Sequence, residues 1–434
     1  MKKRVTIILI IIIAIAIIII AGFVIIKNSS NATQGLSSLC SNEEDCKIFC
    51  LNNQGRCEEY CIEGEDELCQ IIFPFDISGE PESIKNENIR EKEDCEGTKI
   101  KFDYPPVNLD ETLVMLPRGL MTGDHVTPVN HHYFQNFDNQ EYDIEVYSPG
   151  KGYITDIAHM PNAEEGKDYH ITIRYTCTLW SYYIYVSNLP EKIKVYAPPK
   201  HGYKGVKIPV EAGELLGYYK NNLDFNLIDK EITLTGFAVP EHYELEAYKL
   251  HVVPDTYEYF NEPIKSKLIE KSIRTAEPIS GKIDYDIYGK LVGNWFLEGT
   301  NGYAGKKPEQ YWEGDLSFVY DYIDPERIVI SIAGYDGEIS QQFGVKGNDP
   351  DPAKISVEEG LVNYELISYD YITNGNSWDR KSLAKNLKTV PSENVMGVIL
   401  VQLIDDRKIK FEAFPGKTAP QAKGFTNNAK IYER

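Results

Sequence analysis

The longest hydrophobic run of the chain covers residues 5–26, and only Thr6 and one glycine interrupt it. About 20 consecutive apolar residues are enough for one helix to cross the hydrocarbon core of a bilayer. The cationic residues 2–4 precede the run, and the positive-inside bias favours keeping them in the cytoplasm. The pattern predicts a cytoplasmic tail (1–4), a transmembrane anchor (5–26) and a single-pass protein of the cell membrane whose remaining domains are extracytoplasmic.

A cleaved secretory signal is the alternative interpretation of this run. Signal peptides have a shorter apolar stretch, of roughly 7–15 residues, followed by a small-residue cleavage site. Here the run is longer and no clear Ala-x-Ala site follows it, so we favour an uncleaved anchor. Two N-glycosylation sequons, at Asn28 and Asn31, come directly afterwards and would be modified only on the extracytoplasmic side.

Beyond residue 99, apolar and polar residues alternate with a period of two and helical periodicity is rare. Clear examples are residues 171–175, 398–403 and 408–412. Alternation rich in Tyr, Val and Ile is typical of half-buried β-strands. We therefore expect a mainly β fold in this part of the chain.

A charged stretch poor in apolar residues, 78–98, precedes the β region and has the composition of a linker. About 335 residues follow it, enough for two domains of ordinary size. We expect one β domain over 99–276 and a second over 277–434. The net charge of −21 argues against a nucleic-acid partner, because phosphates require clustered Lys and Arg.

Six of the eight cysteines lie between Cys40 and Cys69, within a predicted Cys-rich module at 27–77. An even number of cysteines in a small extracytoplasmic segment indicates a disulfide framework. Two Cys-x-x-x-Cys motifs place two sulfurs each on one face of a helix, which favours an antiparallel helical hairpin. The pairs that this geometry favours, with the connectivity left open, are Cys46 with Cys61, Cys50 with Cys57 and Cys40 with Cys69.

A zinc site is the alternative for these cysteines. Structural zinc sites usually have Cys-x-x-Cys knuckles and often His, and this module has neither. Disulfides are favoured also because the module is too short to bury a stabilising core. Cys95 and Cys177 remain, and we expect them to join the start of the 99–276 domain to one of its strands.

The C-terminal region resembles lipocalin and avidin barrels in one motif, the Gly-x-Trp of an opening strand, at Gly293-Asn-Trp295. Candidate strands follow at 315–322, 327–332, 362–368, 396–403, 409–414 and 429–432, with a hairpin turn at Asp405-Asp406. Closing many short strands into an antiparallel barrel removes exposed edges. We expect such a C-terminal β barrel. The pattern does not decide between a ligand cavity and a filled core, and a filled core is the commoner outcome for a small barrel. If Trp295→Ala or Trp312→Ala alters binding without unfolding the chain, the barrel is the functional end of the molecule.

All eight histidines lie in the middle region, between His125 and His251. Imidazole is a common zinc ligand and a common general base, so this segregation points to a metal or catalytic site there. The densest group contains His125, His131 and His132. Neighbouring residues of a strand point to opposite faces, so at most one of His131 and His132 joins a given site.

Five successive segments of the middle region resemble the β domain of lysostaphin-type zinc metallopeptidases, which are peptidoglycan endopeptidases. Residues 147–154 are similar to the family's "V-x-A-x-x-x-G-x-V" and 168–173 to "G-x-x-V-x-I". The next matches are 183–189 with "Y-x-H-L", 206–217 with "V-K-x-G-D-x-V-x-x-G-x-x-I-G" and 223–227 with "H-L-H-F-E". The resemblance implies a lysostaphin-like β domain of the barrel-sandwich type.

The resemblance also implies where a zinc site would lie. The family binds zinc through the His and Asp of an early H-x-x-x-D motif and the second His of H-x-H, and a His in "Y-x-H-L" assists the metal-bound water. Here Tyr185 stands at the position of the assisting His and Asp224 at that of the second H-x-H histidine. The early motif survives, in no unique register, as His125, Asn130 and His131.

Two hypotheses follow for these candidate residues. His131, Asp224 and either His125 or Asn130 form a three-ligand zinc site with an open position, as hydrolytic zinc requires. Alternatively, they are hydrogen-bonded polar residues of a degenerate domain, which is the hypothesis we favour. We therefore expect a non-catalytic cell-envelope protein that needs no cofactor and binds a cell-surface glycan or a protein; the alternative is a divergent zinc-dependent hydrolase.

Overall fold

The computed structural model describes Gly97 and residues 99–434, except 138–142, 161–162, 165, 201, 306–307 and the side chains of 244–246 and 308–309. The predicted anchor, the sequons and seven of the cysteines, including Cys95, lie outside the described residues. Arg90–Arg434 forms one compact unit. In the part of the chain that the structure describes, no helix has the length and apolarity needed to cross a membrane.

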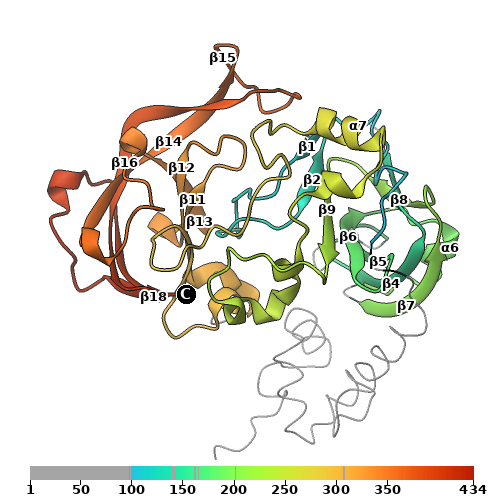
Figure 1. Ribbon diagram of the computed structural model, residues 1–434, viewed down its shortest axis with the longest axis horizontal. Helices are drawn as coiled ribbons and strands as arrows, with labels where there is room; N and C mark the ends of the chain where they lie inside the picture. Colours follow the sequence, from blue (N-terminus) through green and yellow to red (C-terminus); the bar gives the residue numbers. More distant parts are fainter. Residues whose placement is uncertain are drawn as a thin grey trace, which may run out of the picture. The chain divides into compact units, whose positions relative to one another are not determined.

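The described chain is mainly β, as the alternating pattern predicts. Its two α-helices are short, α6 at Glu191–Lys194 and α7 at Ile264–Lys271. A longer 3₁₀ segment, η2, covers Pro240–His251. Two large sheets contain most of the strands (Figure 1).

The first sheet has seven antiparallel strands in the order β1-β2-β9-β6-β5-β4-β7, coloured cyan to green in Figure 1. Their bounds are β1 Val114–Leu116, β2 His132–Gln135, β4 Gly152–His159, β5 Tyr169–Arg174, β6 Leu179–Val186, β7 Tyr203–Val210 and β9 Asn222–Asp229. A separate pair joins β3 (Ile144–Tyr147) to β8 (Leu215–Tyr219).

One face of this sheet packs into the main hydrophobic core, and among the described residues the other face is packed in hydrophobic residues only at its β1–β2 end, at Val114 and Tyr133. In β5, Ile171 and Ile173 are fully buried within the core cluster, whereas the alternate residues His170 and Thr172 point to the opposite face. The other strands of the sheet repeat this alternation. The sheet therefore presents a second face, lined by polar and aromatic side chains, which we call the polar face.

The second sheet closes into an antiparallel barrel of eight strands, because β13 pairs with β14 as well as with β12. Around the barrel the order is β13-β12-β11-β10-β18-β17-β16-β14, and β15 extends β14. The bounds are β10 Gly293–Leu297, β11 Asp315–Tyr320, β12 Ile328–Ala333, β13 Ser340–Val345, β14 Val362–Thr373, β15 Asn376–Ser377, β16 Lys388–Asp405, β17 Lys408–Pro415 and β18 Lys430–Glu433.

The predicted C-terminal barrel is thus confirmed, and the turn that joins β16 to β17 lies at Asp406-Arg407, one residue beyond the predicted Asp405-Asp406. Two strands were not predicted. Strand β13 begins Ser340-Gln-Gln and has apolar side chains only toward its end, so its alternation is weak. Strand β15 has two residues, too few for any periodic signal.

Large side chains fill the barrel. Trp295, Phe318 and Tyr364 are at most 1% exposed and belong to one cluster. The barrel thus has a filled core around Trp295, whose indole Nε1 donates to the Leu291 carbonyl at 2.8 Å, and the Arg434 guanidinium carbon lies 4.1 Å from the Trp295 ring centroid. Gly293 of the Gly-x-Trp motif has φ 117°, and a Cβ there would lie 2.0 Å from Asp286 Oδ1, so only glycine fits.

The two sheets are joined by a mixed hydrophobic cluster. It contains Val114 and Tyr133 from the first sheet together with Ile323, Tyr371 and Trp378 from the C-terminal region. The predicted boundary between 276 and 277 therefore lies between two packed halves of one unit, and it stays a prediction.

Candidate functional site

The centre of the polar face is set by strand register. Asp224 of β9 lies opposite Tyr133 of β2 on one side and Ile184 of β6 on the other. One step along the same face, Asn226 lies opposite Tyr182. Because their neighbours Leu223, Phe225 and Leu227 point into the core, these residues of β9 point to the polar face.

His131 and Asp224 form a buried pair at this centre. His131 Nε2 lies 3.2 Å from Asp224 Oδ2, and the two residues are 6% and 4% exposed. The other carboxylate oxygen accepts a hydrogen bond from Asn222 Nδ2 at 2.8 Å. The structure therefore brings together two of the four candidate metal ligands.

The two other candidates lie beside the imidazole of His131. Asn130 Oδ1 is 3.3 Å from His131 Nδ1, and the Tyr182 hydroxyl lies at the same distance from that nitrogen. The His125 ring is perpendicular to the His131 ring, with 6.1 Å between the centroids. Burial lowers the pKa of His125, and the neighbouring His131 lowers it further.

His132 lies on the opposite side of the strand from this group. Its Nδ1 is 3.2 Å from the Leu116 carbonyl and its Nε2 is 3.0 Å from Thr256 Oγ1. Burial lowers its pKa well below the usual value. The alternation rule is confirmed here, because only His131 of this pair reaches the site.

Three buried polar atoms near the centre have no hydrogen-bond partner in the described structure: Asn130 Nδ2, His131 Nε2 and His170 Nε2. His131 Nε2 is close to the Asp224 carboxylate, but the angles do not make a hydrogen bond, so we regard the pair as an electrostatic contact. Leaving a buried polar group unpaired costs about 1–3 kcal/mol. Such groups call for an explanation, and a binding role is one.

The donor set does not match a hydrolytic zinc site. Imidazole nitrogen and carboxylate oxygen are suitable zinc ligands, but such a site takes three protein ligands. Among the described residues, no group of three His, Cys, Asp or Glu side chains is placed to hold one metal ion. His131 and Asp224 thus supply two donors, and binding of a metal by these candidates stays a prediction.

Tyr185 lies near the end of β6 in a left-handed backbone conformation, with φ 75° and 38% of its surface exposed. Partial burial raises the pKa of its hydroxyl, and the negative charge of Asp224 raises it further. The phenol therefore stays protonated at neutral pH, where an imidazole at this position would be a base.

No protein-family model matches the chain, and no curated protein matches it in sequence. The lysostaphin-like and lipocalin-like resemblances therefore stay predictions that rest on the quoted motifs.

Sequence reasoning missed His170 and Tyr182, whose rings lie 5.4 Å apart on the polar face. Burial lowers the pKa of His170. His170 lies in β5 and Tyr182 in β6, and the motifs had located both strands. The period-two alternation in each strand assigns these side chains to the face opposite the core. The sequence does not predict the strand pairing that places His170 and Tyr182 on the same face as Asp224.

Cys177 of this unit is disulfide-bonded, and its backbone N–H donates to the Gly97 carbonyl at 3.2 Å. Its predicted partner, Cys95, lies outside the described residues, so the pairing itself stays a prediction.

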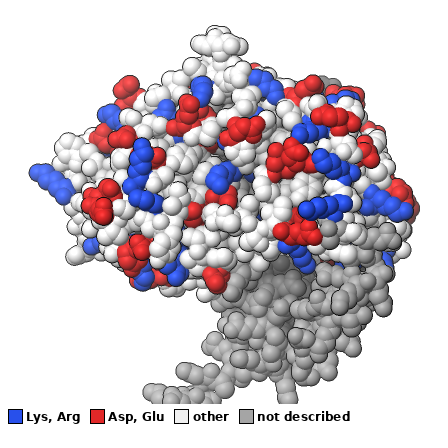
Figure 2. Space-filling view, in the orientation of Figure 1, with Lys and Arg blue, Asp and Glu red and all other residues white. Residues whose placement is uncertain are grey.

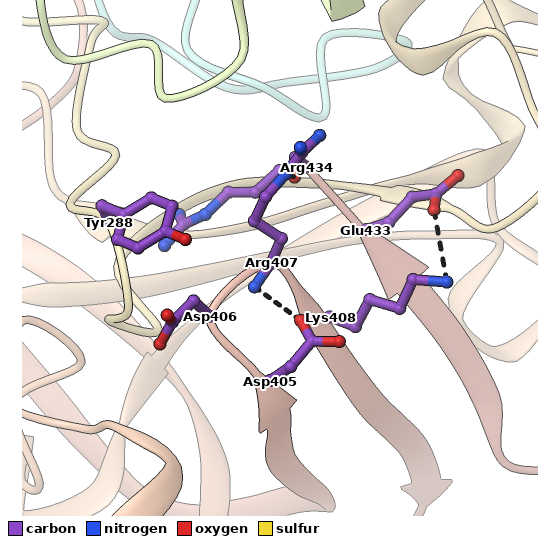
Figure 3. A pocket seen from close by; sticks show the side chains of 7 residues that line it. All are labelled: Tyr288, Asp405, Asp406, Arg407, Lys408, Glu433 and Arg434. Carbon is purple, nitrogen blue, oxygen red and sulfur yellow. Dashed lines mark hydrogen bonds and ion pairs between the residues drawn. The ribbon is translucent and has the colours of Figure 1, made fainter.

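Two pockets lie at the barrel. One, of about 460 Å³, is lined by Tyr288, Asp405, Asp406, Arg407, Lys408, Glu433 and Arg434 (Figure 3). Lys408 and Glu433 of its lining form an ion pair at 3.7 Å, and the Asp405 carboxylate accepts a hydrogen bond from the Arg407 backbone N–H at 2.7 Å. The other, of about 410 Å³, lies between the ends of β12 and β17 and includes Tyr335, Phe411 and Tyr432. On the face shown in Figure 2, acidic and basic side chains are interspersed.

Proposed function

We propose that this chain is a membrane-anchored, extracytoplasmic protein of the cell envelope whose β domain binds a cell-surface ligand and does not catalyse hydrolysis. The observation that carries the proposal is the buried pair of His131 and Asp224, with Nε2 3.2 Å from Oδ2. A carboxylate thus stands where the resembled peptidases have an imidazole ligand. The third donor of a hydrolytic site is not in place among the described residues.

The groups around the pair also favour binding over catalysis. General-base catalysis near neutral pH needs a group with a pKa close to that pH. The phenol of Tyr185, at the position of the assisting histidine, has a raised pKa instead. The phenol of Tyr133, directly opposite Asp224 in register, has a pKa raised well above its usual value by burial.

The test uses the full chain in detergent micelles, purified without chelators. We expect less than one zinc per chain by metal analysis and no cleavage of peptidoglycan stem peptides. One tightly held zinc per chain, lost together with a hydrolytic activity on His131→Ala and on Asp224→Ala, would overturn the proposal. His251→Ala is the matched control, because its Nδ1 bonds the Ile232 carbonyl away from the pair.

A divergent zinc-dependent hydrolase is the second candidate, and one observation favours it. His131 Nε2 and Asp224 Oδ2 are close but not hydrogen-bonded. Two ligands of one metal ion also lie close together without a hydrogen bond between them, because each directs a lone pair at the metal. In that case His125, whose ring centroid is 6.1 Å from that of His131, is the candidate third ligand. His125→Ala should then lower zinc occupancy as strongly as His131→Ala.

A further inference from the structure

The pocket of about 460 Å³ lies at the end of the barrel where β16 joins β17 (Figure 3). One wall is the turn that carries Tyr288, and the other is the hairpin between Asp405 and Lys408. Small-ligand sites usually have volumes of about 300–1,000 Å³. The pocket is therefore large enough for a small ligand or for one unit of a polymer.

The ring of Tyr288 is the apolar part of this pocket. It is 66% exposed, more than any other Tyr, Phe or Trp side chain that the structure describes, whereas the other lining residues are all charged. A ring with so much free surface adds little to the packing of the fold. It offers a ligand an apolar surface to cover, and tyrosine is one of the residues that contribute most to binding when they are covered.

The turn that carries Tyr288 is held in place by the buried side chain of Arg434. Lys290 N–H donates to the Ile287 carbonyl at 3.0 Å and closes the turn. Gly289 has φ 70°, a conformation that glycine adopts freely. Arg434 Nη2 donates to the carbonyls at both ends of the turn. The ring is thus positioned before a ligand arrives, which lowers the entropy cost of binding.

The hairpin wall is joined to the same residue. Arg407 Nε donates to the Arg434 carbonyl at 2.7 Å, and the Arg434 N–H donates to the Arg407 carbonyl at 3.1 Å. The Asp405 carboxylate accepts from the Arg407 backbone N–H at 2.7 Å. Arg434 therefore links both walls, and the pocket between them is preorganised.

The charges of the lining cancel. It contains three acidic and three basic side chains, which are Asp405, Asp406 and Glu433 against Arg407, Lys408 and Arg434. A lining without net charge does not select an ion over a neutral molecule. Its charged groups still form strong hydrogen bonds with neutral hydroxyls. The pocket therefore suits a neutral ligand rich in hydroxyl groups.

Asp406 is the acidic group that is open to such a ligand. Glu433 is paired with Lys408, whereas no hydrogen bond or ion pair within the described part of the chain engages the exposed Asp406 carboxylate. Asp406 lies beside the turn of Tyr288, because a Cβ placed on Gly289 would be 3.1 Å from Asp406 Oδ1 (Figure 3). An acceptor for hydroxyl groups thus lies next to the apolar ring.

We propose that this pocket binds one unit of a neutral glycan, with the Tyr288 ring packed on the C–H face of the sugar and the Asp406 carboxylate accepting from its hydroxyls. A pyranose suits this arrangement because its flat face carries C–H groups and its edge carries hydroxyls. The inference rests on the proposed function, since it names the ligand class of an extracytoplasmic binding protein. It adds a glycan site on the barrel to the polar face of the sheet.

The experiment measures binding of maltohexaose, cellohexaose, chitohexaose and hexagalacturonate to the full chain by titration calorimetry, in a detergent without a sugar head group. We expect a neutral oligosaccharide to bind with an affinity that hardly changes between low and high salt, because screening does not act on a neutral ligand. Tyr288→Ala should weaken binding by about tenfold or more, whereas Tyr288→Phe keeps the ring and should weaken it by less than about threefold. Asp406→Asn should weaken binding by about threefold to tenfold, because it loses a charge-assisted acceptor.

Tyr196→Ala is the matched control. Tyr196 is 43% exposed, follows α6 and does not line the pocket, so its removal should leave the affinity unchanged. Circular dichroism confirms that each variant is folded.

Three outcomes would overturn the inference: no binding of any of the neutral oligosaccharides, equal affinity for Tyr288→Ala and the unchanged chain, or tighter binding of hexagalacturonate than of every neutral oligosaccharide. The zinc and peptidase measurements are independent of these. A failure of the glycan test with no zinc leaves the non-catalytic function standing, whereas stoichiometric zinc with hydrolysis removes that function whether or not the glycan binds.

Discussion

The barrel and the seven-stranded sheet bury polar groups in different ways. In the barrel, the Arg434 guanidinium is 1% exposed and donates to the carbonyls of Val292 and Ile287 while facing Trp295 and Asp286. Only its Nε lacks a hydrogen-bond partner. On the polar face of the sheet, His131 and His170 each leave a ring nitrogen unpaired. An unpaired buried nitrogen costs about 1–3 kcal/mol, so these two histidines reduce the stability of the sheet, as residues of functional sites often do.

The largest loss of stability is expected for a change in the barrel. Trp295→Ala removes a fully buried indole and the surface on which Arg434 packs, so it should cost about 3–5 kcal/mol in the free energy of unfolding. Urea denaturation followed by circular dichroism measures the loss. Trp312→Ala is the control, because Trp312 is only half-buried and packs edge-on against Tyr311. A loss at Trp295 no greater than that at Trp312 would contradict a packed barrel interior.

The sheet side predicts a smaller loss for Asp224→Ala. The change removes the electrostatic contact with His131 and leaves Asn222 Nδ2 without its hydrogen-bond acceptor, and an unpaired polar group costs about 1–3 kcal/mol. Asp224→Asn keeps an acceptor for Asn222 and should lose less than the alanine variant. If both variants are as stable as the unchanged chain, the pair contributes nothing to the fold. In that case its retention would favour the metal-binding alternative.

Acid should destabilise the seven-stranded sheet more than the barrel. His132 and His170 have lowered pKa values because of burial. The unfolded chain therefore binds more protons below about pH 6.5. Their contribution to stability is complete above pH 6.5 and is lost as pH falls toward the folded pKa, by at most about 1.4 kcal/mol per pH unit for each histidine. The barrel has no histidine.

In the barrel, burial raises the pKa of Asp286 and of Asp321. Protonation of these carboxyls favours the folded state, so their contribution is lost as pH rises, the opposite sign to the histidines. Hydrogen exchange at pH 7.5 and 5.5, corrected for intrinsic rates, should show loss of protection in β5 and β9 but not in β16 and β17. His170→Phe removes one titrating ring and should reduce the difference; equal losses in both regions would contradict the assignment.

The sequence predicted those features that depend on the pattern within a single strand. Alternation located most barrel strands, and the acidic turn at Asp405-Asp406 located the hairpin between two of them. Alternation left the interior of the barrel open, because a tryptophan in a Gly-x-Trp strand has the same pattern whether it faces a ligand cavity or a filled core. The contact between His131 and Asp224 depends on pairing of β2 with β9, strands far apart in sequence. No local pattern encodes that pairing, and the motif resemblance supplied the pair only in combination with other candidates.

The smallest effect concerns Tyr185, the residue at the position of the assisting histidine. Its φ of 75° is a conformation that side chains with a Cβ adopt at a cost of about 1 kcal/mol, and that glycine adopts freely. Tyr185→Gly and Tyr185→Ala both remove the exposed phenol. The difference between the stabilities of the two variants therefore measures the cost of the backbone conformation at this position. The glycine variant should be more stable than the alanine variant by about 0.5–1 kcal/mol in urea denaturation. An alanine variant as stable as the glycine variant would show that the backbone at Tyr185 carries no strain.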